Sequence, residues 1–379
     1  MQSVIFKQYS VKLYVNLILK YFGIICLILS TLSTYAAKDT SIVNKVVKQF
    51  GAGVNISLFE QYWKTPDEIC KEPIEEKIKI IADKGFKTVR LPVNFDMFLQ
   101  SDGYNLQNNL IKKLKEILTL TYSLQMKLVI TYHYGKLNDN NCENGEIERI
   151  VSMWKQIQFV FKGNAYEELF FDLYNEPTLS EGKWKTSIIK IVNDLRQEDS
   201  QRIYIIGGND YNSENELMTL GKIADNKIIY TFHYYEPFIF THQGAEWTGN
   251  RTKLTGLPFP YKRRKMPKMP DDFKGTDGEK DYNKYSIEAD GQYLRDRMQQ
   301  IASFCAINQM PLLCTEAGVI REVDNTYRKR YLKALTNAFE EYNINAILWD
   351  YDQRFAIMGD KVSVFSAIRK WIRRSKKRK

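Results

Sequence analysis

The sequence predicts a single (β/α)8 (TIM) barrel with one long insertion after its sixth strand. Eight short apolar runs rich in strand-forming residues recur along the 379 residues, and segments with helical periodicity separate most of them. The runs are continuous rather than alternating, as expected of parallel strands covered on both faces. A length above the usual ~250 residues of such a barrel is compatible with insertions. A hydrophobic content of 44% is typical of a globular protein.

Predicted helices lie between most of the predicted strands. The strands lie at 51–57, 87–93, 127–133, 169–175, 202–208, 228–235, 311–318 and 346–352. The helices lie at 74–85, 109–124, 146–163, 183–197, 285–308 and 325–343. This order favours a closed barrel, with an open doubly wound sheet as the alternative. No GxGxxG motif follows the first strand, which weighs against a dinucleotide-binding version of that sheet.

The one irregular region, residues 243–284, is rich in Gly, Pro, Lys and Arg. We interpret it as a βα insertion on the active face rather than as a linker between domains. Its basic cluster is a candidate for contact with an anionic polysaccharide, although a solvated loop is the simpler interpretation. The cluster consists of Lys262, Arg263, Arg264, Lys265 and Lys268.

The two ends of the chain differ from its body. Residues 1–36 carry three lysines and no acid, and an apolar run is followed by small residues near Ala36 and Ala37. This layout predicts a cleaved signal peptide, with a retained anchor helix as the alternative. We therefore expect a monomeric secreted or periplasmic protein with a catalytic domain at 38–371 and a basic tail at 372–379.

The net charge of +10 comes from these ends. Residues 369–379 contain eight Lys and Arg and no acid, so the two ends supply eleven positive charges and leave −1 for the rest. Nucleic acid is therefore not expected as a ligand, because nucleic-acid binders carry their basic residues on the folded surface. Membrane contact is expected only through the signal segment or the tail, which is otherwise a solvated helix end.

Four cysteines remain after the predicted cleavage: Cys70, Cys142, Cys305 and Cys314. No CxxC spacing occurs among them, so a zinc knuckle is not expected. An exported protein could pair them, and the sequence leaves that open.

Polar residues stand at the ends of six predicted strands. The carboxyl ends of barrel strands meet at one mouth, so these side chains are expected to converge. Each alone has a structural explanation, such as a buried ion pair or a core ring, but the joint pattern favours a site. The residues are Arg90, His133, Asn175, Glu176, His233, Tyr235, Glu316 and Trp349.

Two carboxylates that face each other across a mouth suit hydrolysis of a glycosidic bond. One must be protonated to serve the leaving oxygen, and the other must be charged. Arg90 near Glu316 would favour the anion, and Tyr235 could donate a hydrogen bond to it. Two His and two Glu could instead bind a divalent cation, but no HxH or HExxH spacing occurs, so no metal is predicted.

The remaining polar and aromatic residues suit a sugar. His133, His233 and Asn175 are neutral donors for hydroxyl groups, and Asn175 is suited to the 2-hydroxyl. Trp349, and Trp247 in the insertion, offer flat apolar faces that match a pyranose ring.

These motifs resemble glycoside hydrolase family 5, the cellulase family of clan A. The acid/base segment of that family resembles "DLYNEP" around Glu176, and its nucleophile segment resembles "LLCTEAG" around Glu316. The other matches are "VRLPV" at Arg90, "ITYHY" at His133, "TFHYYEPFIFTHQGAEW" at His233 and Tyr235, and "AILWDYD" at Trp349. The resemblance runs from about Gly51 to Trp371.

The resemblance implies a retaining hydrolase with Glu176 as acid/base and Glu316 as nucleophile, acting on a β-linked polysaccharide or oligosaccharide without metal or cofactor. The sixth-strand segment resembles bacterial endoglucanases more than mannanases, so we expect a secreted endo-β-1,4-glucanase. A β-mannanase, a xyloglucanase, a β-1,3-glucanase and a non-catalytic carbohydrate-binding protein are the alternatives. Tyr134 and Ala317-Gly318 depart from common family residues, which leaves the substrate open.

Overall fold

The computed structural model describes residues 42–163, 166–180, 182–358 and 364–375. The predicted signal segment at 1–36 and the end of the tail at 376–379 lie outside these residues. Within them, no helix has both the length and the apolar character that a membrane span requires.

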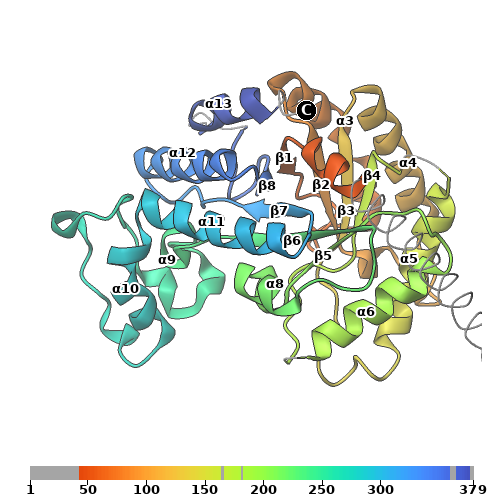
Figure 1. Cartoon of the computed structure of the whole chain (residues 1–379), viewed down its shortest axis with the longest axis horizontal. Coiled ribbons are helices and arrows are strands. Elements are labelled where there is room, and N and C mark those ends of the chain that lie inside the picture. The colour runs from red at the N-terminus through yellow and green to blue at the C-terminus, as the bar shows by residue number, and fades with distance from the viewer. Residues whose placement is uncertain (1–41, 164–165, 181, 359–363, 376–379) are drawn as a thin grey trace, which may run out of the picture.

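Eight parallel strands close into a barrel in chain order, and β1 pairs with β8, so the predicted fold is confirmed (Figure 1). The strands are β1 (Ala52–Asn55), β2 (Thr88–Val93), β3 (Lys127–Tyr132), β4 (Leu169–Asp172), β5 (Tyr204–Gly207), β6 (Ile228–Tyr234), β7 (Leu312–Ala317) and β8 (Asn345–Leu348). All eight lie within or overlap the predicted runs.

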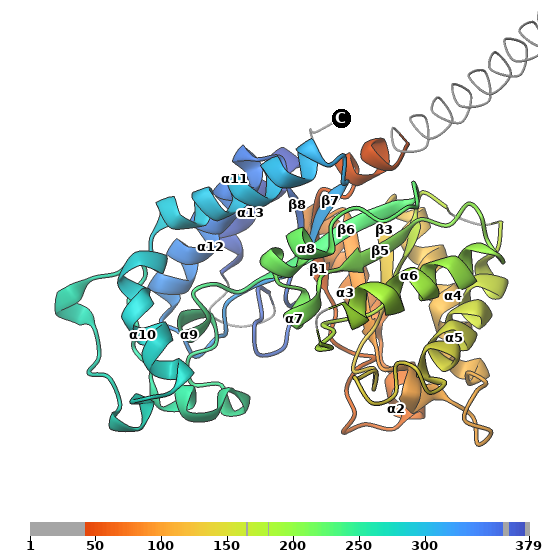
Figure 2. The same ribbon diagram turned by 60° about the horizontal axis from the view of Figure 1, so that its bottom comes forward.

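Helices surround the barrel between successive strands (Figures 1 and 2). The longer ones are α3 (Ile74–Lys84), α4 (Asn108–Ser123), α5 (Glu146–Phe161), α6 (Lys183–Arg196), α10 (Asp277–Glu288), α11 (Gly291–Ile307), α12 (Asn325–Glu341) and α13 (Phe365–Ser375). Short ones follow individual strands: α2 (Pro66–Lys71), η1 (Phe95–Phe98), α7 (Asn209–Asn212), α8 (Glu214–Leu220) and α9 (Phe238–Thr241).

The barrel is closed at one end by apolar side chains. Inward residues of the strands form one cluster with the helical segment 42–48 and with Phe50, whose ring centroid lies 4.7 Å from that of Phe170. In Figure 2 this segment and α2 lie at opposite ends of the barrel. Because α2 follows the carboxyl end of β1, segment 42–48 covers the amino ends of the strands. The mouth therefore lies at the other end, where the carboxyl ends of the strands meet. The inward strand residues are Val129, Phe170, Ile205, Ile229, Leu313 and Ile347.

The insertion is more regular than predicted. It contains three short 3-10 helices, η2 (Glu246–Lys253), η3 (Arg263–Lys265) and η4 (Asp271–Phe273), and the start of α10. The prediction of a single helix at 285–308 is wrong, because the helix is interrupted between α10 and α11. Asp290 has extended backbone dihedrals there and caps α11 by accepting a hydrogen bond from the Gln292 amide at 2.6 Å.

The predicted domain end at Trp371 also needs correction. The boundary falls inside α13, which continues to Ser375 and buries Ile372 to 1% exposure. The Ser375 hydroxyl accepts a hydrogen bond from the Ala52 amide at 3.0 Å, next to the start of β1. The last turn of this helix is therefore part of the barrel. The four described cysteines are all free.

This correction leads to a stability prediction. Ile372→Ala should lower the free energy of unfolding by about 2–5 kcal/mol, because it opens a cavity against the barrel. The neighbouring Arg373→Ala removes an exposed side chain and should change it by less than about 0.5 kcal/mol. Urea denaturation of the two variants compares them directly. Equal, small effects would mean that residues after Trp371 are not part of the folded domain.

Candidate active site

A buried guanidinium lies at the centre of the mouth. Arg90, on β2, has no exposed surface, and its five N–H donors reach five different side chains. Nε donates to Asp172 at 2.9 Å, and Nη1 donates to Glu316 at 2.6 Å and to Asn55 at 2.9 Å. Nη2 donates to Asn175 at 2.8 Å and to Thr131 at 3.4 Å. Arg90 thereby ties together residues of β1, β2, β3, β7 and the β4 region.

Glu316 reaches the mouth through a bulge in β7. Leu313 and Thr315 both face inward, since Leu313 belongs to the inner cluster and the Thr315 hydroxyl lies 2.7 Å from that of Thr231. Regular alternation would therefore point Glu316 outward. The β6–β7 register shifts between Phe232 and His233, so that His233 pairs with Glu316, and the extra residue turns this carboxylate into the mouth.

Glu176 reaches the mouth through a left-handed turn. It lies four residues after the end of β4 and has a φ of 49°. Residues other than glycine are disfavoured in this left-handed region. The preceding residue is anchored, because the Asn175 amide donates to the Tyr132 carbonyl at 2.9 Å. The surrounding packing therefore holds a conformation that costs about 1–2 kcal/mol, and this conformation places the carboxyl opposite Glu316.

The two glutamates and His233 form one compact group. One ligand atom from each of the three lies within 4.8 Å of the other two. His233 Nδ1 lies 2.8 Å from Glu176 Oε1, and the Tyr235 hydroxyl donates to Glu316 Oε2 at 3.0 Å. His233 and Tyr235 share a face because they are two residues apart at the end of β6, which Tyr235 directly follows.

The surroundings set the protonation states. Burial raises the pKa of Glu176 to about 7, and Arg90 opposes the shift. Because 31% of this side chain still faces the open mouth, water opposes the shift and a bound ligand would strengthen it. Burial also raises the pKa of Glu316, while the paired Arg90 favours its anion. Burial lowers the pKa of His233 to about 4 and that of His133 well below its usual range, so both rings are neutral at pH 7.

One side of the mouth is formed by β1, β3 and β8. The His133 ring stacks on Trp349 with centroids 5.6 Å apart, and Trp349 is half-buried. Trp349 is held by close approach of its backbone to Gly318, where an added Cβ would lie 2.3 Å from the Trp349 carbonyl oxygen. Tyr134 continues the aromatic surface outward, and its ring lies 6.3 Å from that of Tyr62.

Sequence reasoning missed several residues of this mouth. Asn55 and Asp172 support Arg90 from inward strand positions, which period-two alternation along β1 and β4 could have indicated. Glu60 is 6% exposed and its Oε2 lies 3.3 Å from His133 Nε2. Burial raises the pKa of Glu60 to about 7, and the hydroxyl of Tyr134 opposes the shift. No sequence pattern marked Glu60, because it lies in the irregular segment after β1.

The predicted site residues converge, except for Trp247. Trp247, in η2, is 57% exposed. The His242 ring lies between it and Tyr235, with ring centroids 6.5 Å from Trp247 and 5.0 Å from Tyr235. The Arg354 guanidinium lies 4.8 Å from the Trp247 ring centroid. Trp247 therefore belongs to the outer rim on the insertion side, beyond the residues that surround the two glutamates.

The donor set of Glu176, His233 and Glu316 does not fit a metal ion well. Both oxygens of Glu316 already accept hydrogen bonds, from Arg90 and from Tyr235. A guanidinium 2.6 Å from a carboxylate opposes the binding of a second cation there.

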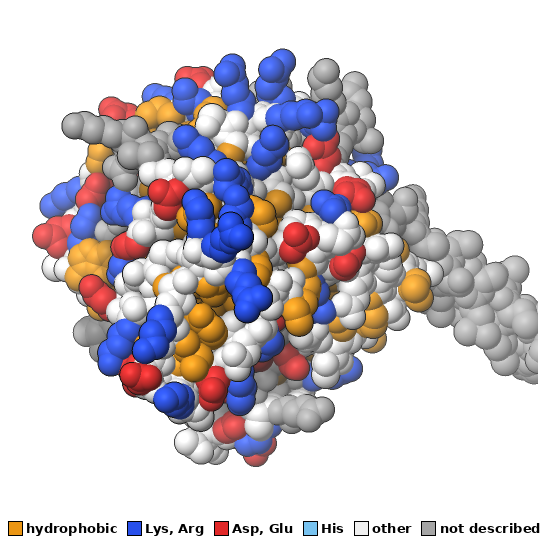
Figure 3. Space-filling view, turned by 90° about the vertical axis from the view of Figure 1, so that its left-hand side faces the viewer, with side chains coloured by type: hydrophobic (Ala, Val, Ile, Leu, Met, Phe, Trp, Pro, Cys, Tyr) orange, Lys and Arg blue, Asp and Glu red, His pale blue; other side chains and the backbone are white. Residues whose placement is uncertain are grey.

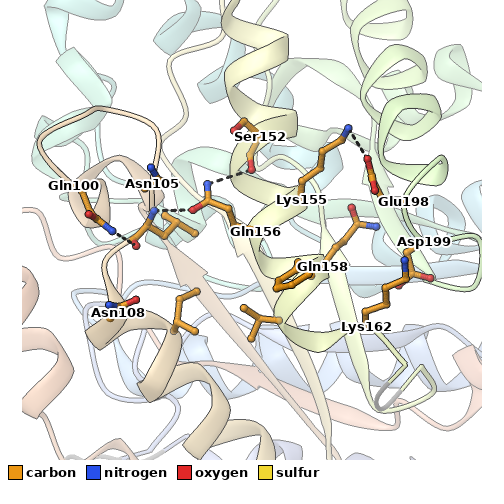
Figure 4. Close-up of a pocket in the computed structure, with 14 residues that line it drawn as sticks. Gln100, Asn105, Asn108, Ser152, Lys155, Gln156, Gln158, Lys162, Glu198 and Asp199 are labelled. Atoms are coloured by element: carbon orange, nitrogen blue, oxygen red, sulfur yellow. Dashed lines mark hydrogen bonds and ion pairs between the residues drawn. The ribbon is translucent and has the colours of Figure 1, made fainter.

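A separate cavity of about 550 Å³ lies on the outer wall of the barrel beside α5 (Figure 4). Several of its polar side chains already have partners. Lys155 pairs with Glu198 at 3.0 Å, and Gln156 accepts from the Leu106 amide at 2.9 Å and donates to the Ser152 carbonyl at 3.2 Å. We assign no chemistry to this cavity.

The sequence is similar to those of known proteins. Residues 47–354 match the model of the family described as cellulase (glycosyl hydrolase family 5). Endoglucanase 3 of Fibrobacter succinogenes is 28% identical over 341 residues, which cover 83% of this chain and 51% of the relative. Endoglucanase C of Acetivibrio thermocellus is 29% identical over 324 residues, covering 80% and 91%. The chain thus spans about half of the first relative.

Solved structures share the fold. An endoglucanase from the hyperthermophile Thermotoga maritima superposes with a TM-score of 0.71 at 22% identity, covering 87% of this chain and 99% of that one.

Removing the central guanidinium should destabilise the fold in a pH-dependent way. Arg90→Met leaves Asp172 and Glu316 buried without their cation, and it should lower the free energy of unfolding by about 3–5 kcal/mol at neutral pH. Without Arg90 both carboxyls hold protons more tightly in the folded than in the unfolded chain. Stability then falls as pH rises above the unfolded pKa values of about 4, so the deficit should be smaller at pH 5 than at pH 8.

Urea denaturation at the two pH values measures this. Arg251→Met, which breaks the partly exposed pair with Asp281, is the matched control and should cost less than about 1 kcal/mol. A deficit for Arg90→Met that is the same at both pH values would mean that the two carboxyls do not depend on this guanidinium.

Proposed function

The chain belongs to glycosyl hydrolase family 5, and on that premise we propose that it is an exported endo-β-1,4-glucanase that retains the anomeric configuration. The observation that carries the mechanism is the spacing of Glu176 and Glu316, which bring carboxylate oxygens within 4.8 Å of each other. Retaining glycosidases have carboxyl groups about 5–5.5 Å apart, whereas inverting enzymes need about 6.5–9.5 Å to admit a water molecule.

Each glutamate has one role in the first step. Glu176, with its raised pKa, gives its proton to the leaving glycosidic oxygen. A carboxylate oxygen of Glu316 forms a bond to the anomeric carbon as the bond to that oxygen breaks. Arg90 and Tyr235 hold the attacking carboxylate in position by hydrogen bonds to its two oxygens.

The second step reverses the role of Glu176. Once Glu316 is esterified, it no longer carries the negative charge that balances Arg90. The positive charge of Arg90 already lowers the pKa of Glu176, and it lowers this pKa further once the charge of Glu316 no longer offsets it. Glu176 is left as a carboxylate by its earlier proton transfer and can take a proton from water. The resulting hydroxide displaces Glu316 from the sugar, and the configuration is retained.

The walls of the mouth support a polymeric substrate. Asn175 Oδ1 accepts a hydrogen bond from Arg90, so the side-chain amide nitrogen of Asn175 can donate to a sugar hydroxyl. The stacked His133 and Trp349 offer a flat face for one ring. Exposed Tyr62, Trp63 and Tyr134 extend beyond this face, and Trp247 stands on the insertion side. Aromatic surfaces on both sides of the catalytic pair suit a chain that crosses the mouth, as endo action requires.

The choice of β-1,4-glucan and of export has separate support. Both curated relatives described above are named endoglucanases, at 28% and 29% identity. Export is supported by the sequence of residues 1–36, which has the layout of a signal peptide.

Reducing-sugar release from a glycan panel tests the function. In the presence of EDTA, the protein should release sugar from carboxymethylcellulose and mixed-linkage β-glucan. Glu176→Gln should lower this rate by about 10²–10⁴-fold, and Glu316→Gln should abolish it. Glu143→Gln, which changes an exposed carboxylate outside the mouth, should keep full activity.

The same panel separates the alternatives. Preferential release from glucomannan, xyloglucan or laminarin would replace the glucan assignment while keeping the mechanism. Full hydrolysis by Glu176→Gln would overturn the acid/base role. If the folded protein releases no sugar from any glycan, the result would favour a non-catalytic carbohydrate-binding protein.

The pH profile tests the protonation states. Because Glu176 must be protonated and its pKa is raised to about 7, kcat/KM on β-glucan should fall as pH rises through about 7. This alkaline limb of the pH profile arises because a poor leaving group must receive a proton from Glu176. It should therefore disappear in Glu176→Gln assayed with a dinitrophenyl cellobioside, whose leaving group needs no proton. Persistence of the limb in that variant would assign it to another residue.

A further inference from the structure

The basic residues of the insertion fall into two groups. Those in η2, the η4 region and α10 are paired with carboxylates, for example Lys253 with Asp272 at 2.6 Å, Arg251 with Asp281 at 2.7 Å and Lys280 with Asp277 at 2.9 Å. Those around η3 are different. They are all exposed, and no carboxylate of the described chain lies within 4.0 Å of their nitrogens. This second group is Lys262, Arg263, Arg264, Lys265 and Lys268.

The backbone that carries the unpaired group is held in place. The Tyr261 amide donates to the Ala289 carbonyl at 2.8 Å, and the Tyr282 hydroxyl donates to the Pro267 carbonyl at 2.8 Å. Met266 and Met269 pack against the main hydrophobic core. The segment is therefore held against the rest of the domain, and less conformational entropy is lost when it binds a partner than a free loop would lose.

The charge continues onto α12. Lys265 Nζ lies 3.5 Å from the Tyr327 hydroxyl, and the Arg330 guanidinium lies 5.8 Å from the Tyr327 ring centroid. Arg330 and Lys333 are exposed and three residues apart, so they share one face of α12. The η3 group together with Arg330 and Lys333 is called the basic band below. Asp324, the cap of α12, is a nearby carboxylate.

Figure 3 views this side of the molecule, which carries α10 and one end of α12. Lys and Arg side chains form a band from the middle of the face to its top, where Figure 1 places α13. Exposed Arg369 and Arg373 lie on that helix. Unpaired charge thus extends over three elements that are far apart in sequence.

We propose that the basic band is a second polysaccharide-binding surface, apart from the mouth, which takes an anionic glycan that carries carboxylate or phosphate groups. An extended row of cations suits a linear polyanion better than a single small anion. The basic segment 262–268 contains no exposed large hydrophobic side chain that could enter a bilayer, and on the neighbouring α10 only Ile287 is such a side chain, so the charge favours a polymer over a membrane. The choice of a glycan as the polymer rests on the proposed function, whereas the unpaired charge does not.

Binding of the full chain to polymers that the mouth is not expected to cleave tests the proposal. Polygalacturonate supplies carboxylates, phosphorylated dextran supplies phosphates, and plain dextran supplies neither. The test variant carries Arg263→Gln, Arg264→Gln, Lys265→Gln and Lys268→Gln. The matched control carries Lys253→Gln, Lys274→Gln, Lys280→Gln and Lys284→Gln, which removes the same charge from paired residues of the same insertion.

The protein and the control should bind at least one of the two polyanions, with an affinity that falls as salt rises, and should not bind dextran. The test variant should lose about tenfold or more in affinity at low salt, since it lacks four exposed charge contacts. Whichever polyanion binds identifies the anionic group. Equal weakening of both variants would show a net-charge effect only and would overturn the proposal.

Two further measurements complete the test. Band-dependent binding to anionic-lipid vesicles or RNA that is tighter than binding to both polyanions would overturn the choice of a glycan. Hydrolysis of neutral β-glucan should be unchanged in both variants, because neither alters the mouth. Loss of hydrolysis on every glycan with intact band binding would instead count against the proposed function alone.

Discussion

The site depends on one buried cation. Arg90 has no contact with water, so each of its donors must find a partner within the barrel, and each partner is a residue that the mouth needs. Its bonds to Glu316 and Asn175 position the proposed nucleophile and the amide that we propose binds a sugar, and its bonds to Asn55 and Asp172 fix the guanidinium itself. The geometry of the proposed site and the stability of the barrel around its mouth therefore depend on the same set of contacts.

Both glutamates reach this cation through departures from regular structure. Glu316 faces inward because β7 contains an extra residue opposite β6, and Glu176 does so because its backbone takes a left-handed conformation. Such conformations persist only where the surroundings determine them. Here the surroundings are the regular strands on either side, which explains how an unstrained barrel can carry a site made of irregular backbone.

The sequence predicted the parts of this arrangement that depend on local pattern. Buried parallel strands read as continuous apolar runs, so all eight were found, and polar residues at their ends marked Arg90, Glu176 and Glu316. Asn55 and Asp172 were missed because alternation marks them only as inward positions, whereas their pairing with Arg90 is long-range and has no local signature; Glu60 lies in an irregular segment. The end of the domain was misplaced because the alternating apolar and basic residues of α13 resemble a tail, whereas Ile372 and Ser375 pack on the barrel.

The contacts of Arg90 also account for the division of roles among the acids of the mouth. Burial raises the pKa of four carboxyls there: Glu60, Asp172, Glu176 and Glu316. Glu60 and Glu176, whose pKa values are raised to about 7, receive no hydrogen bond from Arg90. Asp172 and Glu316 do, and a charge-assisted hydrogen bond favours the anion. In the proposed mechanism, one guanidinium therefore favours Glu316 as the charged nucleophile and leaves on Glu176 the proton that the leaving oxygen requires.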